Sequence, residues 1–273
     1  MELYNMTEEE LRGVREQELA VLREVDRLCA AHGLRYCLGY GTLLGAIRHK
    51  GFIPWDDDVD IAMPREDFDR LREICATELD GRFFYQSHYT DKNYYYPYDK
   101  IRVNGTVFRE IFFADRDMHQ GVFIDVFPVD HVPEDERLRL RQRRAYRRWY
   151  AVLRYRFLGT AGRSGLRGAA VRLFRFLTGL FPMDWLYKKV EGIMTRYNGT
   201  DTGLMSMFIS DARGRETFPR SYYDDLTYAP FENDKFLIPR AWDEMLEGKF
   251  GDYMTLPPVE QRVSGHKLVE VRL

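Results

Sequence analysis

Near the N-terminus, apolar residues recur at the three- and four-residue spacing of an amphipathic helix. The residues that form this stripe are Leu11, Val14, Leu19, Leu22, Val25 and Leu28. Thr7 precedes three glutamates, which is typical of a helix N-terminus, and Gly33 follows the last apolar position as a typical C-terminal cap. The pattern therefore predicts one long helix over residues 7–32.

Shorter elements follow this helix. Residues 34–40 predict a short strand, Gly41 a turn, and residues 42–49 a short apolar helix. After a loop over 51–57, residues 58–63 alternate between polar and apolar positions, as in a half-buried strand. Pro64 is expected at the first position of the next helix.

The middle of the chain is rich in β-forming residues. Strands are expected over 82–88, 96–103, 106–110 and 121–129, and Asn104-Gly105 predicts a hairpin. Residues 134–198 are helical in pattern with an interruption around 159–165, and a last helix is expected over 239–250. This order predicts an α+β fold: a nucleotidyltransferase-like core with a small mixed β-sheet flanked by helices, and an arginine-rich helical appendage. The expected parts are a catalytic core over 1–133, a basic helical insertion over 134–200, and a C-terminal segment over 201–273 that completes the active site.

The composition is that of a folded protein in a reducing compartment. Of 273 residues, 45% are hydrophobic and 15% aromatic, which is ample for a core. The N-terminal residues are acidic and helical, so no signal peptide is expected, and no apolar run is long enough to span a membrane. Cys29, Cys37 and Cys75 show no paired spacing, which argues against a disulfide framework or a zinc site. We expect a cytoplasmic protein.

Positive charge is concentrated in one block. Between Arg137 and Arg175 there are thirteen arginines and no Asp, Glu or Lys. The formal net charge of the whole chain is −2, so the residues outside this block carry a net charge of −15. Apolar and aromatic residues are interleaved with these arginines. Two interpretations remain open: a peripheral anchor on anionic lipid at the inner face of the cytoplasmic membrane, or a helical subdomain with a solvated arginine face. No nucleic-acid-binding module is recognisable, and no nucleic acid partner is expected.

Four aspartates, Asp56, Asp57, Asp58 and Asp60, directly precede an apolar run. Residues two apart on a strand share a face, so Asp58 and Asp60 are expected to project together, as ligands for Mg²⁺ or Mn²⁺. A third acid on a neighbouring strand would complete the site. The candidate is Asp125, an acid inside an otherwise apolar strand, with Asp130 as the reserve choice.

A phosphate-binding turn is expected upstream of these acids. Gly41 and Thr42 stand at the start of the short helix, where backbone N–H groups and the helix dipole favour phosphate. Together with the acids, they predict metal-assisted phosphoryl or nucleotidyl transfer. The alternative is that the aspartates form a solvent-exposed loop without a ligand, but the apolar strand that directly follows them argues against this. The spacing of an EF-hand calcium loop is absent.

At these residues the sequence resembles the LicD family of phosphocholine transferases, which are relatives of the fukutin-type ribitol-phosphate transferases. The resemblance runs through GTLLGAIRHKGFIPWDDDVDIAMPREDFDRL (41–71), YDKIRVNGT (98–106), GVFIDVFPVD (121–130) and FGDYMTLPPVEQRVSGH (250–266). It implies a divalent metal and a CDP-linked alcohol such as CDP-choline as donor. It also implies transfer of the phospho-alcohol to a hydroxyl of a cell-surface glycan. If the arginine-rich helices anchor the protein on the membrane, a lipid-linked glycan is the expected acceptor.

The resemblance also implies roles for individual residues. It implies that Asp58, Asp60 and Asp125 are the metal-binding and catalytic acids, and that Gly41 and Thr42 bind phosphate. Lys100 and Arg102 are candidates to bind the diphosphate, and Arg48 and His49 could reach the same phosphates. Arg262 and His266 are candidates to close the site. Trp55 and the tyrosines at 94–96 could cage a quaternary ammonium by cation–π contact. Ordinary surface cations and core aromatics are the alternatives at these positions.

Two other functions remain open at this stage. A nucleotidyltransferase would use the same acids but attach the nucleoside monophosphate itself to its acceptor. A non-catalytic protein that binds membranes or polyanions would account for the arginine block, but it would have no use for an acid triad.

Overall fold

The computed structural model describes residues 3–157, 165–209 and 216–273. In these ranges the chain forms a mixed α/β structure around one seven-stranded sheet and two two-stranded sheets. The elements, in chain order, are α1 Glu8–His32, β1 Cys37–Leu38, α2 Tyr40–Arg48, β2 Asp60–Pro64, α3 Arg65–Glu78, β3 Phe83–Gln86, β4 Asp99–Val103, β5 Val107–Glu110, β6 Phe123–Val132, α4 Glu136–Phe157, α5 Gly165–Thr178, α6 Met183–Met194, η1 Thr195–Tyr197, β7 Leu204–Ser206, β8 Thr217–Pro219, α7 Ser221–Asp224, β9 Leu226–Phe231, β10 Asp234–Pro239, α8 Trp242–Phe250, η2 Val259–Gln261 and β11 Leu268–Arg272.

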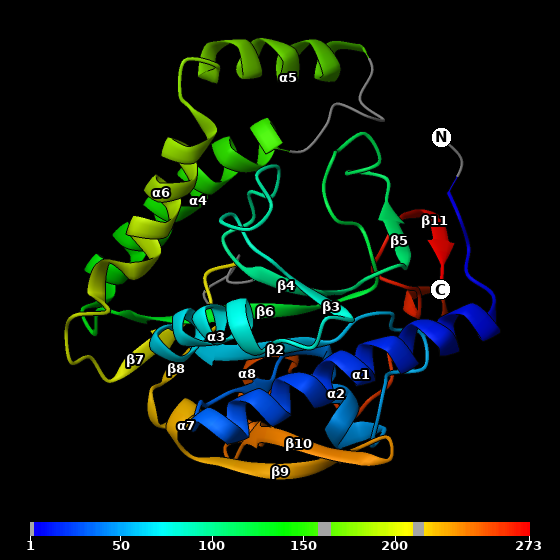
Figure 1. Cartoon of the computed structure of the whole chain (residues 1–273). Coiled ribbons are helices and arrows are strands. Elements are labelled where there is room, and N and C mark those ends of the chain that lie inside the picture. The colour runs from blue at the N-terminus through cyan, green and yellow to red at the C-terminus, as the bar shows by residue number, and fades with distance from the viewer. Residues whose placement is uncertain (1–2, 158–164, 210–215) are drawn as a thin grey trace.

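The central sheet has the strand order β1-β2-β6-β4-β3, with β7 paired to β6 and β8 to β7. β2 and β6 are parallel, whereas the other neighbouring strands are antiparallel. Helices flank this sheet: α1 and α3 pack on β6, and α2 packs on β2 (Figure 1). The predicted small mixed sheet flanked by helices is therefore confirmed.

Helix α1 begins and ends where the sequence predicts. The side chain of Thr7 accepts a hydrogen bond from the backbone N–H of Glu10, and the Glu10 carboxylate accepts one from the N–H of Thr7, which completes a capping box. Gly33 caps the C-terminus with a φ of 64°, in the left-handed region that favours glycine. The apolar stripe of this helix lies in the main core.

Strand β2 is shorter than predicted. It begins at Asp60, and Asp58 lies in the preceding loop. Val59 and Ile61 are fully buried, as the alternating pattern predicts. Pro64 is the N-cap of α3 rather than its first helical residue, because it also ends β2.

The predicted hairpin at Asn104-Gly105 is wrong. Gly105 does turn the chain, with a φ of 79°, but β4 pairs with β3 and β6 while β5 pairs with β11 near the C-terminus. A turn signal predicts pairing between the two strands next to it in the chain, and it cannot predict a partner such as β11, which lies near the C-terminus. The strands of the C-terminal third, β7 to β11, are short and were not predicted.

The arginine-rich region forms two layers. Helix α4 packs on α6, and a separate core of apolar side chains fills their interface, including Tyr146, Leu153, Leu186 and Val190. Helix α5 lies against α4 and stands apart from the sheet, at the top of Figure 1. Most of the predicted interruption at 159–165 lies outside the described residues. None of the helices described is long and apolar enough to cross a membrane.

Candidate active site

The parallel pairing of β2 and β6 brings two acids together. Asp60 on β2 and Asp125 on β6 are register partners, so their side chains lie next to each other on one face of the sheet. The N–H of Asp60 donates to the Thr42 hydroxyl oxygen at 2.8 Å, and the N–H of Asp125 donates to the Val59 carbonyl at 2.8 Å. Asp125 thus lies on a strand adjacent to Asp60, as predicted.

The loop before β2 adds further carboxylates. Oxygens of Asp56, Asp57 and Asp58 lie within 4.8 Å of one another. Burial, followed by the charges of Asp60 and Asp56, raises the pKa of Asp58 well above its ordinary value. Burial and the charge of Asp125 do the same for Asp60. Burial is the first cause of these raised pKa values, and the neighbouring carboxylates add to it; a bound cation would offset the negative charge gathered here.

Arg15 on α1 fixes the shape of this acidic loop. Its guanidinium donates to the carbonyls of Ile53 and Pro54 at 2.9 and 3.0 Å, and to the carbonyl of Asp56 at 2.8 Å. These bonds go to backbone carbonyls and not to the aspartate side chains. Glu18, one helical turn further along α1, is 2% exposed, and burial followed by the charge of Asp58 raises its pKa well above the ordinary value.

Asp57 has a different role from its neighbours. Its carboxylate lies 3.1 Å from Nδ1 of His266 and accepts a hydrogen bond from the Ser264 hydroxyl. Burial raises the pKa of Asp57, but the hydrogen bonds and charge from His266 and Ser264 outweigh it and bring the pKa below the ordinary value. Burial alone would lower the pKa of His266, but the bond to Asp57 and nearby acidic charges raise it to about 9. The C-terminal motif is thus attached to the acidic loop by a buried ion pair.

Two lysines face the acids. The Lys100 ammonium on β4 lies 2.5 Å from the Asp125 carboxylate and is 2% exposed. Lys249 on α8 lies 2.8 Å from Glu216 and 3.3 Å from the centre of the Tyr40 ring, and its charge acts on Asp60. Lys249 was missed by the sequence analysis, although it directly precedes the 250–266 motif. Glu18 was missed because it stands within an ordinary helical pattern.

The predicted phosphate-binding turn lies in the first turn of α2, which begins at Tyr40. A Cβ atom at Gly41 would lie 2.9 Å from a carboxylate oxygen of Asp56, so a larger residue here would displace this carboxylate. The Thr42 hydroxyl accepts the bond from Asp60 described above and can still donate its own proton. Both residues thus border the acid cluster.

Four other candidates form a cluster beside the acidic loop. The Arg262 guanidinium lies over the Trp55 ring, 5.4 Å from its centre, and the His49 ring meets the edge of Trp55 at 6.3 Å. Arg48 donates to the carbonyl of Tyr253 at 2.7 Å. Burial, followed by the charge of Arg48, lowers the pKa of His49. The sequence motifs at 41–71 and 250–266 therefore meet in space.

Other candidates lie in the interior with partners of their own. Arg102 is 2% exposed and donates to the Gln86 side chain and to the Gly121 carbonyl. The rings at 94–96 pack mainly among aromatic residues such as Tyr98 and Phe157 rather than against Trp55. The reserve acid Asp130 is fully buried and forms a two-pronged pair with Arg65 at 2.8 and 2.9 Å, as well as a bond from Asn198. Since Arg65 already offsets its charge, Asp130 is not part of the acid cluster.

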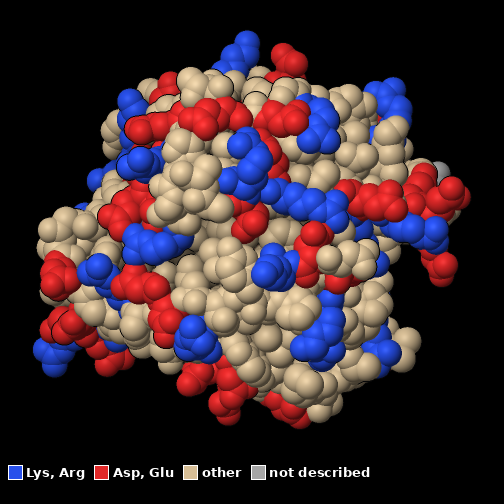
Figure 2. All heavy atoms as spheres, turned by 60° about the horizontal axis from the view of Figure 1, so that its bottom comes forward, with Lys and Arg blue, Asp and Glu red and all other residues tan. Residues whose placement is uncertain are grey.

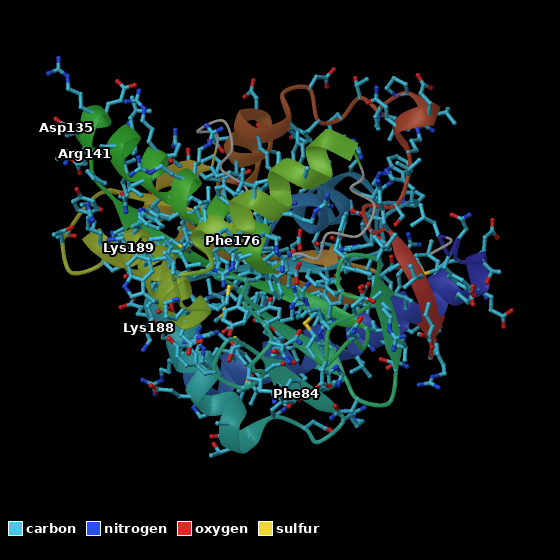
Figure 3. All side chains as sticks on the ribbon, turned by 90° about the horizontal axis from the view of Figure 1, so that it is seen from above. Phe84, Asp135, Arg141, Phe176, Lys188 and Lys189 are labelled. Carbon is cyan, nitrogen blue, oxygen red and sulfur yellow. The ribbon has the colours of Figure 1, made fainter. Side chains whose placement is uncertain are left out.

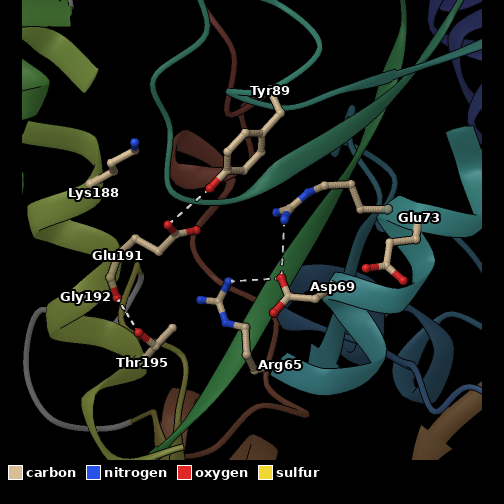
Figure 4. A pocket seen from close by; sticks show the side chains of 9 residues that line it. Arg65, Asp69, Glu73, Tyr89, Lys188, Glu191, Gly192 and Thr195 are labelled. Carbon is tan, nitrogen blue, oxygen red and sulfur yellow. Dashed lines mark hydrogen bonds and ion pairs between the residues drawn. The ribbon is translucent and has the colours of Figure 1, made fainter. Parts of the chain in front are cut away.

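A cavity of about 620 Å³ lies at the opposite end of β2, between α3 and α6 (Figure 4). Several of its polar side chains already have partners: Arg72 pairs with Asp69 and Asp99, and the Tyr89 hydroxyl donates to Glu191. Several carboxylates are gathered at the acid cluster, so we assign the chemistry there and not to this cavity.

Comparison with known proteins identifies the type of domain that contains the acid cluster. Residues 33–151 match the model of the LicD/FKTN/FKRP nucleotidyltransferase domain. The chain is 27% identical, over 93% of its length and 96% of the relative's, to the lipopolysaccharide cholinephosphotransferase LicD of Haemophilus influenzae. It is also 42% identical to the ribitol 5-phosphate transferase FKRP of human and mouse, over 22% of this chain and 13% of that protein. The chain therefore contains a nucleotidyltransferase domain of the LicD/FKTN/FKRP type over residues 33–151, and it is similar to a LicD protein over nearly its whole length.

Proposed function

We propose that this protein transfers a phospho-alcohol from a CDP-linked donor to a hydroxyl of a cell-surface glycan and releases CMP. Phosphocholine from CDP-choline is the first donor to test, because the relative that is similar over nearly the whole chain is a lipopolysaccharide cholinephosphotransferase. The observation that carries the proposal is the register pairing of Asp60 with Asp125 beside Asp58, within a LicD-type domain.

The acid cluster fits Mg²⁺ or Mn²⁺. Its donors are carboxylate oxygens, which these hard cations prefer, and burial together with neighbouring carboxylates raises the pKa of Asp58 and of Asp60. Asp58, Asp60 and Asp125 would hold the metal, with Asp56 next to them. A bound divalent ion would supply positive charge against the phosphate oxygens.

The transfer step follows from this arrangement. The acceptor oxygen attacks the phosphorus that bears the alcohol, a new P–O bond forms, and the bond from that phosphorus to the CMP oxygen breaks. A carboxylate oxygen of Asp125 or Asp60 takes the hydroxyl proton. Lys100 lies beside Asp125 and provides positive charge near the departing CMP. Arg102 is not needed in this step, because its guanidinium is already bound by Gln86 and Gly121.

The second candidate function is nucleotidyl transfer, which is supported by the match of residues 33–151 to a nucleotidyltransferase domain. There the acceptor attacks the α-phosphorus of a nucleoside triphosphate, and pyrophosphate leaves. The two reactions differ in which phosphorus is attacked, so their products differ in mass.

Product analysis tests the proposal. The protein is incubated with Mg²⁺, a glycan acceptor and each of several CDP-alcohols, or with CTP or ATP, and the products are analysed by mass spectrometry. Acceptor that carries a phospho-alcohol, together with free CMP, is the expected result. Acceptor that carries a nucleoside monophosphate, with pyrophosphate from CTP or ATP, would establish the second candidate. No turnover with any donor would favour a binding protein.

A further inference from the structure

Helix α5, its connection to α6 and the first turn of α6 expose seven large apolar side chains within residues 173–185. We call this group the apolar tip. Its members and their exposed fractions are Leu173 59%, Phe174 36%, Phe176 79%, Leu177 60%, Leu180 88%, Phe181 37% and Trp185 42%. Single exposed apolar residues are common on protein surfaces, but a contiguous group of this kind marks an interaction site.

The apolar tip is held in place by its own packing. The rings of Phe181 and Trp185 stack at 5.1 Å, and Trp149 of α4 meets the edge of Trp185 at 5.5 Å. Arg156 of α4 donates to the carbonyls of Thr178 and Phe181. The tip is therefore a built feature of the helical region, and the α4–α6 core is filled by other side chains.

The surroundings of the apolar tip are basic. From Arg137 to Met183 the chain has thirteen arginines and no acid. Figure 3 looks down on α5 and shows Phe176 on this helix, with Lys188 and Lys189 on α6. Exposed arginines lie along α4 and α5, among them Arg141, Arg144, Arg147, Arg148, Arg154 and Arg172. By contrast, acidic and basic side chains are interspersed on the face turned forward in Figure 2.

We propose that the apolar tip docks on a membrane surface that contains anionic lipid. Hydrocarbon at the headgroup boundary would cover the apolar side chains, and anionic headgroups would complement the arginines. A single-stranded nucleic acid would complement the charge but not the aliphatic side chains of Leu173, Leu177 and Leu180, which offer no stacking surface. The inference concerns a surface away from the acid cluster and does not depend on the proposed reaction.

The structure also limits how much of the region enters the membrane. Leu153 on α4 and Leu186 and Val190 on α6 are fully buried between these helices and are not available to lipid. The contact is therefore restricted to the apolar tip, while the exposed arginines of α4 remain at headgroup level. Membrane binding should accordingly depend on a few side chains of α5 and its C-terminal connection.

Vesicle flotation of the full chain tests this inference. Vesicles of phosphatidylcholine alone are compared with vesicles that also contain phosphatidylglycerol, at low and high salt. The wild type should float with the anionic vesicles at low salt, and less at high salt. The double variant F176S/L180S should bind at least about tenfold more weakly, because it removes two large inserted side chains. Tyr228→Ser is the matched control: this residue is 50% exposed on the β9–β10 hairpin, at the bottom of Figure 1, and its variant should float like the wild type.

The inference has clear contrary outcomes. Absence of flotation, or equal flotation of F176S/L180S and wild type, would overturn it. A dimer in light scattering that F176S/L180S converts to monomer, without flotation of either, would show that a second copy covers the tip. Displacement from vesicles by single-stranded RNA in the wild type, with no effect of F176S/L180S on flotation, would point to nucleic acid. Turnover with a soluble acceptor, measured on the same samples, tests the proposed function separately and should be the same in all three proteins.

Discussion

The imidazole of His266 lies 3.1 Å from the carboxylate of Asp57, although 209 positions separate them in the chain. The Phe108 and Phe123 rings pack against the same imidazole, with ring centres at 5.6 and 5.5 Å, and Asp57 is fully buried while the His266 side chain is 15% exposed. Among the neighbouring aspartates, Asp57 is thus the one with a cationic partner of its own. This pair holds the C-terminal motif against the acidic loop, whereas Asp56 and Asp58 remain available to the acid cluster.

His266→Gln should destabilise the protein in a pH-dependent way. Below pH 6.5, the ordinary value, His266 is protonated in both folded and unfolded chains, so the ion pair contributes fully to stability. The contribution declines as the unfolded chain loses its proton and is gone once the pH rises past the folded pKa of about 9. We expect the variant to lose roughly 2–4 kcal/mol of unfolding free energy near pH 6 and little near pH 10. Urea unfolding at a series of pH values measures this difference, and a pH-independent difference would contradict the ion pair.

Replacing any one of the three acids by asparagine should leave the protein folded and lower its turnover rate at least about 100-fold. The variants are Asp58→Asn, Asp60→Asn and Asp125→Asn. Each removes a negative charge that holds the metal and thereby stabilises the transferred phosphate. Initial rates at saturating Mg²⁺ and donor provide the measurement, with circular dichroism to check folding. Asp225→Asn is the control, since this acid is exposed and pairs only with Arg240 at the surface. Near-normal rates in all three variants would remove the acid cluster from the mechanism.

The sequence predicted those parts of the site that depend on local pattern. The alternation around Val59 and Ile61 identified the strand with the acids, and an acid inside an apolar run identified Asp125. The pairing of β2 with β6, and the register that places Asp60 beside Asp125, could not be derived, because strand partners are chosen by the whole fold.

Long-range contacts explain the remaining differences. Arg102 was predicted to neutralise the diphosphate, but its guanidinium lies in the interior and donates to Gln86 and to the Gly121 carbonyl. The Asn104-Gly105 turn looked like a hairpin until β11 proved to be the partner of β5. In each case the deciding partner is distant in sequence and has no local signature.

Metal should stabilise the folded protein, and more so at higher pH. Without metal, the raised pKa values of Asp58 and Asp60 mean that the folded chain binds more protons than the unfolded chain, whose aspartates titrate near 3.8. Unfolding free energy in EDTA should therefore fall as the pH rises above 3.8 through the raised values. Added Mg²⁺ should raise the melting temperature more at pH 8 than at pH 5. Asp58→Asn should melt higher than wild type in EDTA and gain less from Mg²⁺, whereas an equal Mg²⁺ shift in both proteins would contradict a site at this acid.

Gly41→Ala should slow turnover without unfolding the protein. The new Cβ atom would lie 2.9 Å from a carboxylate oxygen of Asp56, so this side chain must move away from the acid cluster. Alanine also favours the helix at this position, so we expect little net loss of stability and a fall in turnover of about tenfold or more. Gly192→Ala on α6 is the matched control, because no heavy atom lies within 4 Å of its new Cβ atom. This control should gain about 0.5–1 kcal/mol of unfolding free energy at unchanged turnover. Equal turnover in the two variants, measured at saturating donor and Mg²⁺, would show that the position of Asp56 does not matter to the reaction.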